Sequence, residues 1–388
     1  FVKFLYFCKN IIMKPIKMVD LQTQYLKIKT EIDSAIQDVI DTTAFINGPA
    51  INALKNILKK YLNVKHVIPC ANGTDALQLA LMSLDLKPGD EVITPTFTFI
   101  STVEVVALLG LKPVFVDVDP DTFNINVDDI KNAITDKTKA IIPVHLFGQC
   151  ADMEVIMNIA RENNIYVIED NAQAIGADFN FADGNTMKAG TIGDIGCTSF
   201  FPSKNLGCYG DGGAIFTNSD ELADKLSYIA NHGMKIKYHH EYIGVNSRLD
   251  TLQAAILKVK LQYLDDYIMA RQKAANYYDN AFANESNLKI PKRFAKSTHV
   301  FHQYTLQTNN FSRDELIKFL AERQIPSMIY YPVPIHMQKA YQKYVKTNDY
   351  FPISEYLAQN VISLPMHTEL DEEQLEYITK SVLEFINK

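Results

Sequence analysis

Short apolar runs alternate with segments of helical periodicity along the first two thirds of the chain. The helical segments are 75–84, 103–109, 127–133 and 155–163, and the apolar runs are 67–70, 91–94, 113–118, 140–144, 166–169 and 213–217. Runs of valine and isoleucine without polar alternation are typical of a parallel sheet that is covered on both faces. The pattern therefore predicts an α/β fold, in which right-handed crossovers bring the carboxyl ends of the strands to one edge.

The pattern changes near residue 250. A long helical stretch, about 251–283, is expected to lead the chain out of the sheet. The elements predicted beyond it are a strand at 304–307 and helices at 314–323 and 372–385. Because 388 residues are too many for one small core, we expect a large, mainly parallel sheet domain over residues 13–265 and a smaller α+β domain over residues 266–388.

The first twelve residues are largely apolar but include Lys3 and Lys9. This segment is too short to span a bilayer and has no small-residue cleavage site. We interpret residues 1–12 as an N-terminal extension ahead of a start at Met13, with an amphipathic surface anchor as the alternative. No other run approaches the length of a membrane span, so we expect no membrane partner.

Composition narrows the class of protein. The formal net charge of −7 leaves no basic footprint, so we expect no nucleic-acid partner. The five cysteines are scattered, and they form neither a CxxC pair nor a spacing typical of metal ligands. We therefore expect no metal site and a reducing, cytoplasmic location.

The strongest chemical signal combines one lysine with one aspartate. Lys204 ends the sequence SFFPSK, just ahead of a glycine-rich turn at 207–213, and the apolar run 165–168 ends in Glu169 and Asp170. This arrangement is typical of a pyridoxal phosphate (PLP) site, where the lysine forms a Schiff base and the aspartate pairs with the pyridine nitrogen. Burial beside a cationic ring would lower the pKa of Lys204 toward neutrality. The alternative is a surface lysine together with a helix-capping aspartate.

A second motif suits a single phosphate group. NGTDAL at 72–77 opens a predicted helix, where Gly73 permits close backbone approach and Thr74 adds a hydroxyl. Simple N-capping is the alternative, because these residue types are common at helix starts. The chain lacks both the dinucleotide GxGxxG pattern with its acidic partner and the GK[ST] of a P-loop.

Further residues are candidates for holding a flat cofactor. Phe99 follows a predicted strand and can stack on a ring, although core packing is the alternative. Gln173 lies three residues beyond the aspartate and is a candidate donor to the phenolic oxygen. Ser199 lies five residues before the lysine and is a candidate for the phosphate. His145, just after the apolar run 140–144, is a candidate for the floor of the pocket.

Four motifs together resemble one known family. They are NGTDAL at 72–77, EDNAQ at 169–173, SFFPSKNLG at 199–207 and GVNSRLD at 244–250. In this order they resemble the DegT/DnrJ/EryC1/StrS family of sugar-nucleotide aminotransferases, and the resemblance runs from about residue 16 to near the C-terminus. It implies the PLP-dependent transferase fold type I, which is the aspartate-aminotransferase-like fold, with pyridoxal 5'-phosphate as cofactor.

The resemblance also implies roles for particular residues. The cofactor-binding residues it implies within one chain are Gly73, Thr74, Phe99, Asp170, Gln173, Ser199 and Lys204. Lys204 is the implied catalytic residue, and Asn246 would reach the phosphate of the neighbouring subunit's cofactor in a homodimer with shared active sites. Arg248 and Tyr304 are the implied substrate contacts. A structural ion pair between Arg248 and Asp250 is the alternative for the arginine.

The implied reaction is a transamination. Related sugar dehydratases carry histidine where this chain keeps Lys204, so an aminotransferase with L-glutamate as donor is favoured. The sequence blocks 200–213, 301–305 and 329–334 most resemble enzymes that aminate C3 of a UDP-linked 3-keto-2-acetamido sugar of the glucuronate type. A dTDP-3-keto-6-deoxyhexose or a 4-keto sugar nucleotide is the alternative substrate.

Two other classes of function stay open at this point. One is a non-catalytic PLP-binding regulatory protein. The other is a PLP lyase or desulfurase, which would need a catalytic cysteine on a mobile loop. Cys208 is the nearest cysteine to Lys204 in the sequence, and the glycines around it favour a packed position.

Overall fold

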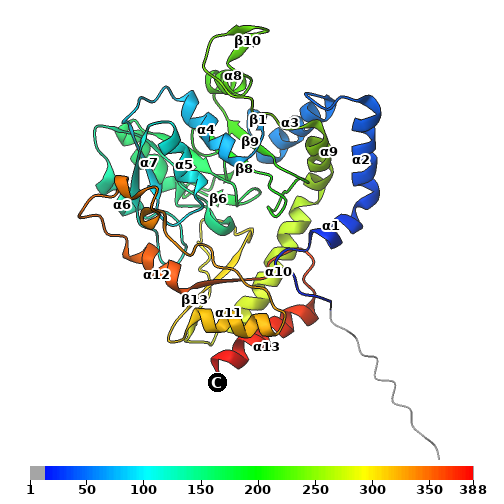
Figure 1. Cartoon of the computed structure of the whole chain (residues 1–388), viewed down its shortest axis with the longest axis vertical. Coiled ribbons are helices and arrows are strands. Elements are labelled where there is room, and N and C mark those ends of the chain that lie inside the picture. The colour runs from blue at the N-terminus through cyan, green and yellow to red at the C-terminus, as the bar shows by residue number, and fades with distance from the viewer. Residues whose placement is uncertain (1–13, 388) are drawn as a thin grey trace, which may run out of the picture.

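The computed structural model describes residues 14–387, which form a seven-stranded central sheet with helices on both faces (Figure 1). The strands in spatial order are β1 (His66–Cys70), β9 (Gly213–Thr217), β8 (Ile195–Ser199), β5 (Tyr166–Asp170), β4 (Thr138–Ile141), β2 (Glu91–Pro95) and β3 (Lys112–Val116). Only β9 runs antiparallel to its neighbours within this described sheet. The predicted mainly parallel sheet is confirmed, and six of its strands coincide with the predicted apolar runs.

The seventh strand, β8, was missed by the sequence pattern. It reads Ile-Gly-Cys-Thr-Ser, so it offers one large aliphatic side chain where the other strands offer several. Small residues are required here because a Cβ on Gly196 would lie 1.9 Å from the carbonyl oxygen of Gly190. β8 places two predicted site residues at the edge of the sheet, Ser199 at its end and Lys204 in the turn that follows.

Both faces of the sheet are buried, as the apolar runs predict. Neighbouring residues of β5 illustrate this, since Val167 and Ile168 are both fully buried but belong to separate hydrophobic clusters. The helices whose residues join the cluster of Ile168 are α4 (Gly73–Ser83), α5 (Ser101–Leu108) and α8 (Asp220–Ile229). Those that join the cluster of Val167 are α3 (Pro49–Leu62), α6 (Val127–Ala133), α7 (Met153–Asn163), α9 (Thr251–Lys260) and α10 (Leu264–Phe282).

The predicted helical stretch 251–283 is helical in the structure, but it is divided. A 3-10 turn at Leu261–Tyr263 separates α9 from α10 (Leu264–Phe282). The N-terminal helices α1 (Leu21–Lys27) and α2 (Lys29–Thr42) lie beside α9, as Figure 1 shows, and Ile32 packs with Ile256.

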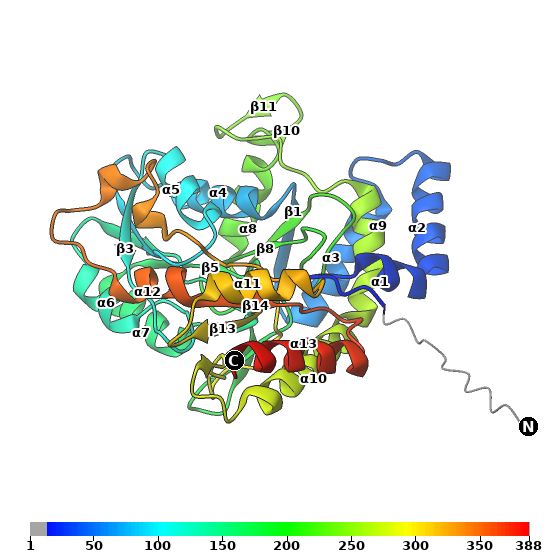
Figure 2. The same ribbon diagram turned by 60° about the horizontal axis from the view of Figure 1, so that its bottom comes forward.

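A second, antiparallel sheet is formed by the C-terminal part of the chain. Its strands are β12 (Leu288–Lys289), β13 (Tyr304–Thr308) and β14 (Val361–Leu364), and the helices around it are α10, α11 (Arg313–Glu322), α12 (Pro352–Asn360) and α13 (Glu372–Ile386) (Figure 2). The predicted strand and the two predicted helices are confirmed. The domain boundary at 265/266 stays a prediction, and Ile16 packs into the core of this smaller sheet.

The remaining strands form two short hairpins, β6 (Asp178–Asn180) with β7 (Thr186–Lys188) and β10 (Met234–Ile236) with β11 (His239–His240). Between β13 and β14 the chain returns to the large sheet. There the backbone N–H of Ile335 donates to the carbonyl oxygen of Thr96 at 2.9 Å, and Ser354 donates to Asp117 at 2.6 Å. This return places residues 329–331 over the edge of the sheet where β2 and β5 end.

The predictions for residues 1–12 and for a start at Met13 concern positions outside the described residues. Within residues 14–387, no helix is both long enough and apolar enough to cross a bilayer. The same residues contain no group of three or more histidine, cysteine or acidic side chains arranged to hold a metal ion.

Candidate active site

A cavity of about 790 Å³ opens where β1, β2, β5 and β8 end. The predicted site residues that line it are Gly73, Thr74, Phe99, Asp170, Gln173, Ser199 and Lys204. They come from four separate loops, which meet because the strands that precede them are parallel. The structure thus brings together all seven residues assigned to one chain's cofactor site, and their individual roles stay predictions.

Asp170 is the last residue of β5, and its carboxylate is held at both oxygens. The Thr102 hydroxyl donates to Oδ2 at 2.8 Å, and the backbone N–H of Ala172 donates to Oδ1 at 3.2 Å. Burial raises the pKa of Asp170, while these two hydrogen bonds and the positive charge of Lys204 oppose the rise. An ionised carboxylate held in this way suits a cationic partner in the cavity.

Lys204 lies in the turn that follows β8, where its backbone N–H donates to the carbonyl oxygen of Phe201 at 2.9 Å. The side chain is half-buried in the wall of the cavity. Burial lowers the pKa of Lys204 to about 8, and the negative charge of Asp170 partly opposes this effect. A substantial fraction of the amine is therefore neutral near physiological pH, as a nucleophile and base requires.

The start of α4 forms a cradle for an anion beside the end of β8. Asn72 caps the helix by accepting the backbone N–H of Asp75 at 2.8 Å. The N–H groups of the first helical residues, Gly73 and Thr74, have no partner within the helix. A Cβ on Gly73 would lie 2.7 Å from Cβ of Ser199, so glycine allows the two loops to approach closely. This geometry suits a phosphate at a helix N-terminus.

Phe99 and Gln173 occupy opposite environments at the cavity. The Phe99 ring is 54% exposed, whereas the nearby Phe97 ring is 1% exposed. Phe97 therefore takes the core position that was the alternative for Phe99, and Phe99 presents an aromatic face to the cavity. Gln173 is fixed, because its Oε1 accepts the backbone N–H of Phe147 at 2.7 Å while its Nε2 donates to the Tyr331 hydroxyl at 3.0 Å.

Asn246 and Arg248 do not line the cavity of their own chain. Asn246 is exposed and Arg248 is half-buried, in the segment that follows the β10–β11 hairpin. Between them, Ser247 anchors the segment by donating to Asp75 at 2.6 Å. No ion pair joins Arg248 to Asp250 among the described residues, so the structural alternative for the arginine is not found. Their predicted contacts with a neighbouring subunit stay predictions.

Tyr304 lies outside the cavity, which disagrees with its predicted contact with substrate. The side chain is fully buried in β13, where its hydroxyl donates to Asp279 at 2.8 Å and its ring lies 4.8 Å from that of Tyr278. Burial raises the pKa of Tyr304, and the charge of Asp279 adds to the effect. Gln303 lines the cavity instead, because successive residues in an extended segment point to opposite sides.

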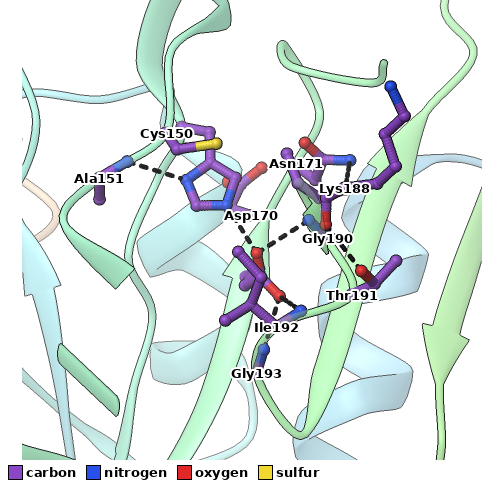
Figure 3. Close-up of polar contacts among 12 residues, drawn as sticks. Cys150, Ala151, Asp170, Asn171, Lys188, Gly190, Thr191, Ile192 and Gly193 are labelled. Atoms are coloured by element: carbon purple, nitrogen blue, oxygen red, sulfur yellow. Dashed lines mark hydrogen bonds and ion pairs between the residues drawn. The ribbon is translucent and has the colours of Figure 1, made fainter. Parts of the chain in front are cut away.

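His145 is buried beneath the cavity rather than exposed at its floor. The backbone N–H of Ala151 donates to His145 Nδ1 at 3.2 Å, so the proton is on Nε2, which donates to Glu169 Oε2 at 2.8 Å. Glu169 also accepts the backbone N–H groups of Gly190, Ile192 and Gly193 at 2.6–2.8 Å (Figure 3). Adjacent residues of β5 thus face opposite sides of the sheet. Glu169 binds the turn at residues 190–193, and Asp170 lines the cavity.

Replacing Glu169 with glutamine should destabilise the protein. An amide accepts hydrogen bonds at one oxygen only, so two of the four donors around Glu169 would face an NH2 group. We expect the loss to be about 3 kcal/mol in free energy of unfolding, measured by urea denaturation. Glu162→Gln makes the same chemical change at an exposed position of α7 and should leave the midpoint unchanged. Equal midpoints for the two variants would contradict a supporting role for Glu169.

Cys208 is a buried thiol, which argues against a desulfurase. Its Sγ lies 3.0 Å from the carbonyl oxygen of Phe200 and 3.1 Å from that of Gly210, so its single proton is shared between these two acceptors. Burial raises the pKa of Cys208 to about 11, so the reactive thiolate is scarce at neutral pH. The side chain is not among the residues that line the cavity.

Several residues at the cavity were not singled out from the sequence. Thr102 holds Asp170, and the cavity is also lined by His302, Gln303, Tyr330 and Tyr331 from the C-terminal part of the chain. The blocks that contain the last four were noted only for their resemblance to a family. Their position depends on the return of the chain from the small sheet, which no local pattern predicts. Thr102 lies three residues after the predicted site residue Phe99, but a threonine near a helix start is common without such a contact.

The arrangement as a whole fits pyridoxal phosphate. The cavity offers a cradle for one phosphate, a buried carboxylate held as an acceptor, an amine of lowered pKa and an exposed aromatic face. Each of these four features lies at the end of a different strand-to-helix or strand-to-turn connection. A core of packed side chains would not leave Phe99 and Lys204 facing the same space.

A model of the DegT/DnrJ/EryC1/StrS aminotransferase family matches residues 26–383. "Pleiotropic regulatory protein" of Geobacillus stearothermophilus is 46% identical to this chain, over 95% of this chain and 98% of its own length. UDP-2-acetamido-2-deoxy-3-oxo-D-glucuronate aminotransferase of Pseudomonas aeruginosa is 45% identical, over 94% and 98%. UDP-N-acetyl-3-dehydro-alpha-D-glucosamine 3-aminotransferase of Acidithiobacillus ferrooxidans is 46% identical, over 94% and 96%.

Solved structures show the same architecture. A DegT/DnrJ/EryC1/StrS aminotransferase from Brucella abortus is 42% identical and superposes with a TM-score of 0.91, covering 96% of this chain and 100% of its own. The NtdA protein of Bacillus subtilis, solved with bound cofactor PMP, is 30% identical with a TM-score of 0.89, covering 98% of this chain and 87% of its own.

Proposed function

The chain belongs to the DegT/DnrJ/EryC1/StrS aminotransferase family, and on that premise we propose that it transfers the amino group of L-glutamate to the C3 ketone of a UDP-linked 2-acetamido-3-keto sugar of the glucuronate type. The observation that carries the proposal is the meeting of Lys204 and Asp170 in one cavity, next to a phosphate cradle. When bound, pyridoxal phosphate accepts the amino group of the donor and passes it to the ketone.

The residues of the chain divide the remaining work. Lys204 attaches the cofactor and, as a free amine, moves a proton to and from the substrate carbon. Asp170 keeps the ring nitrogen protonated by pairing with it. The first turn of α4 and Ser199 anchor the phosphate, while Phe99 covers one face of the ring. Gln173, whose Nε2 donates one hydrogen to the Tyr331 hydroxyl, would donate its second amide hydrogen to the phenolic oxygen of the cofactor.

A homodimer completes the proposed site. The charged side chains that line the cavity are one lysine, Lys204, and the aspartates Asp75, Asp170 and Asp211, counted over the described part of the chain. A cofactor phosphate, a nucleoside diphosphate and a glutamate carboxylate together need more positive charge than this. Asn246 and Arg248 of a second copy would supply a phosphate contact and a guanidinium, and neither is used in its own chain's cavity.

The two curated enzymes named above bear on the substrate. Both names specify a UDP-linked sugar with oxygen functionality at C3, and they differ in whether C6 is oxidised to an acid. Arg248 suits the acidic form, because a guanidinium binds carboxylates in a bidentate manner. For the compartment we propose the cytoplasm, since the four cysteines within the described residues are free and buried.

A panel of keto sugars tests this function. With L-glutamate as donor, we expect kcat/KM for UDP-2-acetamido-3-keto-glucuronate to exceed that for a dTDP-3-keto-6-deoxyhexose by about 100-fold, because a site built to bind polar groups rejects analogues that lack them. The measurement is 2-oxoglutarate release in a coupled assay. The reverse order would favour the dTDP alternative. No release with any ketone, and no single-turnover reaction with glutamate, would favour the regulatory role suggested by the name of the Geobacillus relative.

A further inference from the structure

The strongest unassigned feature of the site is the hydroxyl that holds Asp170. Thr102 lies in the first turn of α5 and is fully buried, and its Oγ1 donates to Asp170 Oδ2 at 2.8 Å. The carboxylate is otherwise bound by the backbone N–H of Ala172, at the other oxygen. Thr102 is therefore the side chain that ties the end of β5 to the start of α5.

A second threonine, Thr98, extends this hydrogen bond by one step. The hydroxyl oxygens of Thr98 and Thr102 lie 3.2 Å apart, and both side chains are buried. A hydroxyl has a single proton, and a carboxylate can only accept. Because Thr102 donates to Asp170, Thr98 must donate to Thr102. The result is a short relay from the wall of the cavity to the carboxylate, in which each bond strengthens the next.

We propose that Thr102 is a positioning residue that sets the orientation of the Asp170 carboxylate toward the cofactor's ring nitrogen. The inference rests on the proposed role of Asp170 and adds how that role is achieved. Two of the acceptor positions of the carboxylate are occupied by protein donors, which leaves the remaining positions directed to the cavity. Rotation of the carboxylate would break the bond to Thr102.

The same hydroxyl acts on the ionisation of the carboxylate. Burial raises the pKa of Asp170, and the hydrogen bond from Thr102 is the largest influence that opposes it. Other groups that face Asp170 are Lys204 and His145, which also favour the ionised form, and the buried Tyr331 and Cys197. Loss of the hydroxyl should therefore move the acid limb of kcat/KM to higher pH.

Titration with PLP and with a PLP analogue, together with a matched control variant, distinguishes a role of Thr102 in orienting Asp170 from a role in packing. Thr102→Val removes the hydroxyl and keeps the shape, and Thr102→Ser restores the donor. The control is Thr94→Val, because the Thr94 hydroxyl is buried without a hydrogen-bond partner among the described residues. Each purified apoprotein is titrated with PLP and with its 1-deaza analogue, in which a CH group replaces the ring nitrogen.

We expect Thr102→Val to bind PLP roughly 10-fold more weakly than the wild-type protein, in line with a hydrogen bond to a charged group. The deaza analogue should bind both proteins equally, since it has no ring nitrogen to pair with Asp170. Thr102→Ser and Thr94→Val should match the wild type with both ligands. The acid limb should shift in Thr102→Val alone.

Two outcomes would overturn the inference. One is an unchanged affinity for PLP in Thr102→Val, and the other is an equal loss for PLP and the deaza analogue, which would indicate a packing role. If Thr102→Val fails to fold, Thr98→Val provides the same test one step back in the relay, with a smaller loss for PLP only. The variant Asp170→Asn separates this inference from the proposed function. Normal PLP binding in that variant would contradict the proposed pairing of Asp170 with the ring nitrogen, whatever the result for Thr102.

Discussion

Replacing Lys204 with alanine should abolish transamination and leave the fold intact. In the proposed mechanism the lysine both attaches the cofactor and moves the proton, so we expect turnover to fall by at least about 10³-fold, within the range of positioned general bases. Folding should be preserved because burial disfavours the charged form of Lys204, as its pKa of about 8 indicates. Release of 2-oxoglutarate measures the first effect, and thermal unfolding of the apoprotein measures the second.

Lys260 supplies a matched control for Lys204. Burial also lowers the pKa of Lys260 to about 8, but this lysine lies at the end of α9 and does not line the cavity. Borohydride should fix the cofactor to Lys204 in the wild-type protein and in Lys260→Met, as read by peptide mass spectrometry. A labelled peptide that contains Lys260, or turnover by Lys204→Ala within about 10-fold of wild type, would contradict the assignment.

The sequence predicted those parts of the site that depend on strand ends. Asp170 ends a strand, and Gly73 and Lys204 lie within a few residues of the end of one. Parallel strands bring such positions to one edge regardless of loop details. That is why residues more than one hundred positions apart could be placed in one pocket from local patterns. Strand β8 was missed, yet Lys204 was still found, because its small and glycine-rich surroundings were visible without the strand.

The parts that were not predicted depend on packing between distant segments. Tyr330 and Tyr331 reach the cavity only because the chain returns from the small sheet to β2 and β3. The segment 301–305 does reach the cavity, but Tyr304 was the wrong residue within it. A shift of one residue along an extended segment exchanges the side that faces the core and the side that faces the cavity. Gln303 and Tyr304 are neighbours, and only one of them can point to the ligand.

A second kind of failure concerns polar residues that act behind the site. His145 follows a predicted strand and Glu169 lies within one, and both have side chains that could take part in chemistry. The sequence does not distinguish a position that faces the cavity from one that is buried beneath it. The structure separates them through hydrogen bonds to backbone groups, which satisfy Glu169 completely. A carboxylate surrounded by four donors has no acceptor capacity to spare for a ligand.

Replacing Asp170 with asparagine should lower kcat/KM by about 100-fold, or ~3 kcal/mol of transition-state stabilisation. Asparagine keeps the size of the side chain and an oxygen that can accept from Thr102, while its NH2 group replaces the oxygen that accepts the backbone N–H of Ala172. What is lost is the negative charge that, in the proposed mechanism, holds the ring nitrogen protonated. The apoprotein should keep close to wild-type stability. Burial disfavours the charged carboxylate, as the raised pKa of Asp170 shows, so removing the charge offsets the hydrogen bond from Ala172 that is lost.

Asp194→Asn is the control that isolates the charge at the cavity. Burial raises the pKa of Asp194, as it does for Asp170. Asp194 also contacts β5, because it accepts the backbone N–H of Val167 at 2.8 Å, but it does not line the cavity. Its replacement should leave kcat/KM within about 2-fold of wild type, since it touches neither ligand nor Asp170. Equal activity of both variants would show that the ring nitrogen has no need of Asp170. A large loss in both would trace the effect to the strand rather than to the charge. Only a loss confined to Asp170→Asn is consistent with direct pairing, because that variant alone changes the charge that faces Lys204 across the cavity.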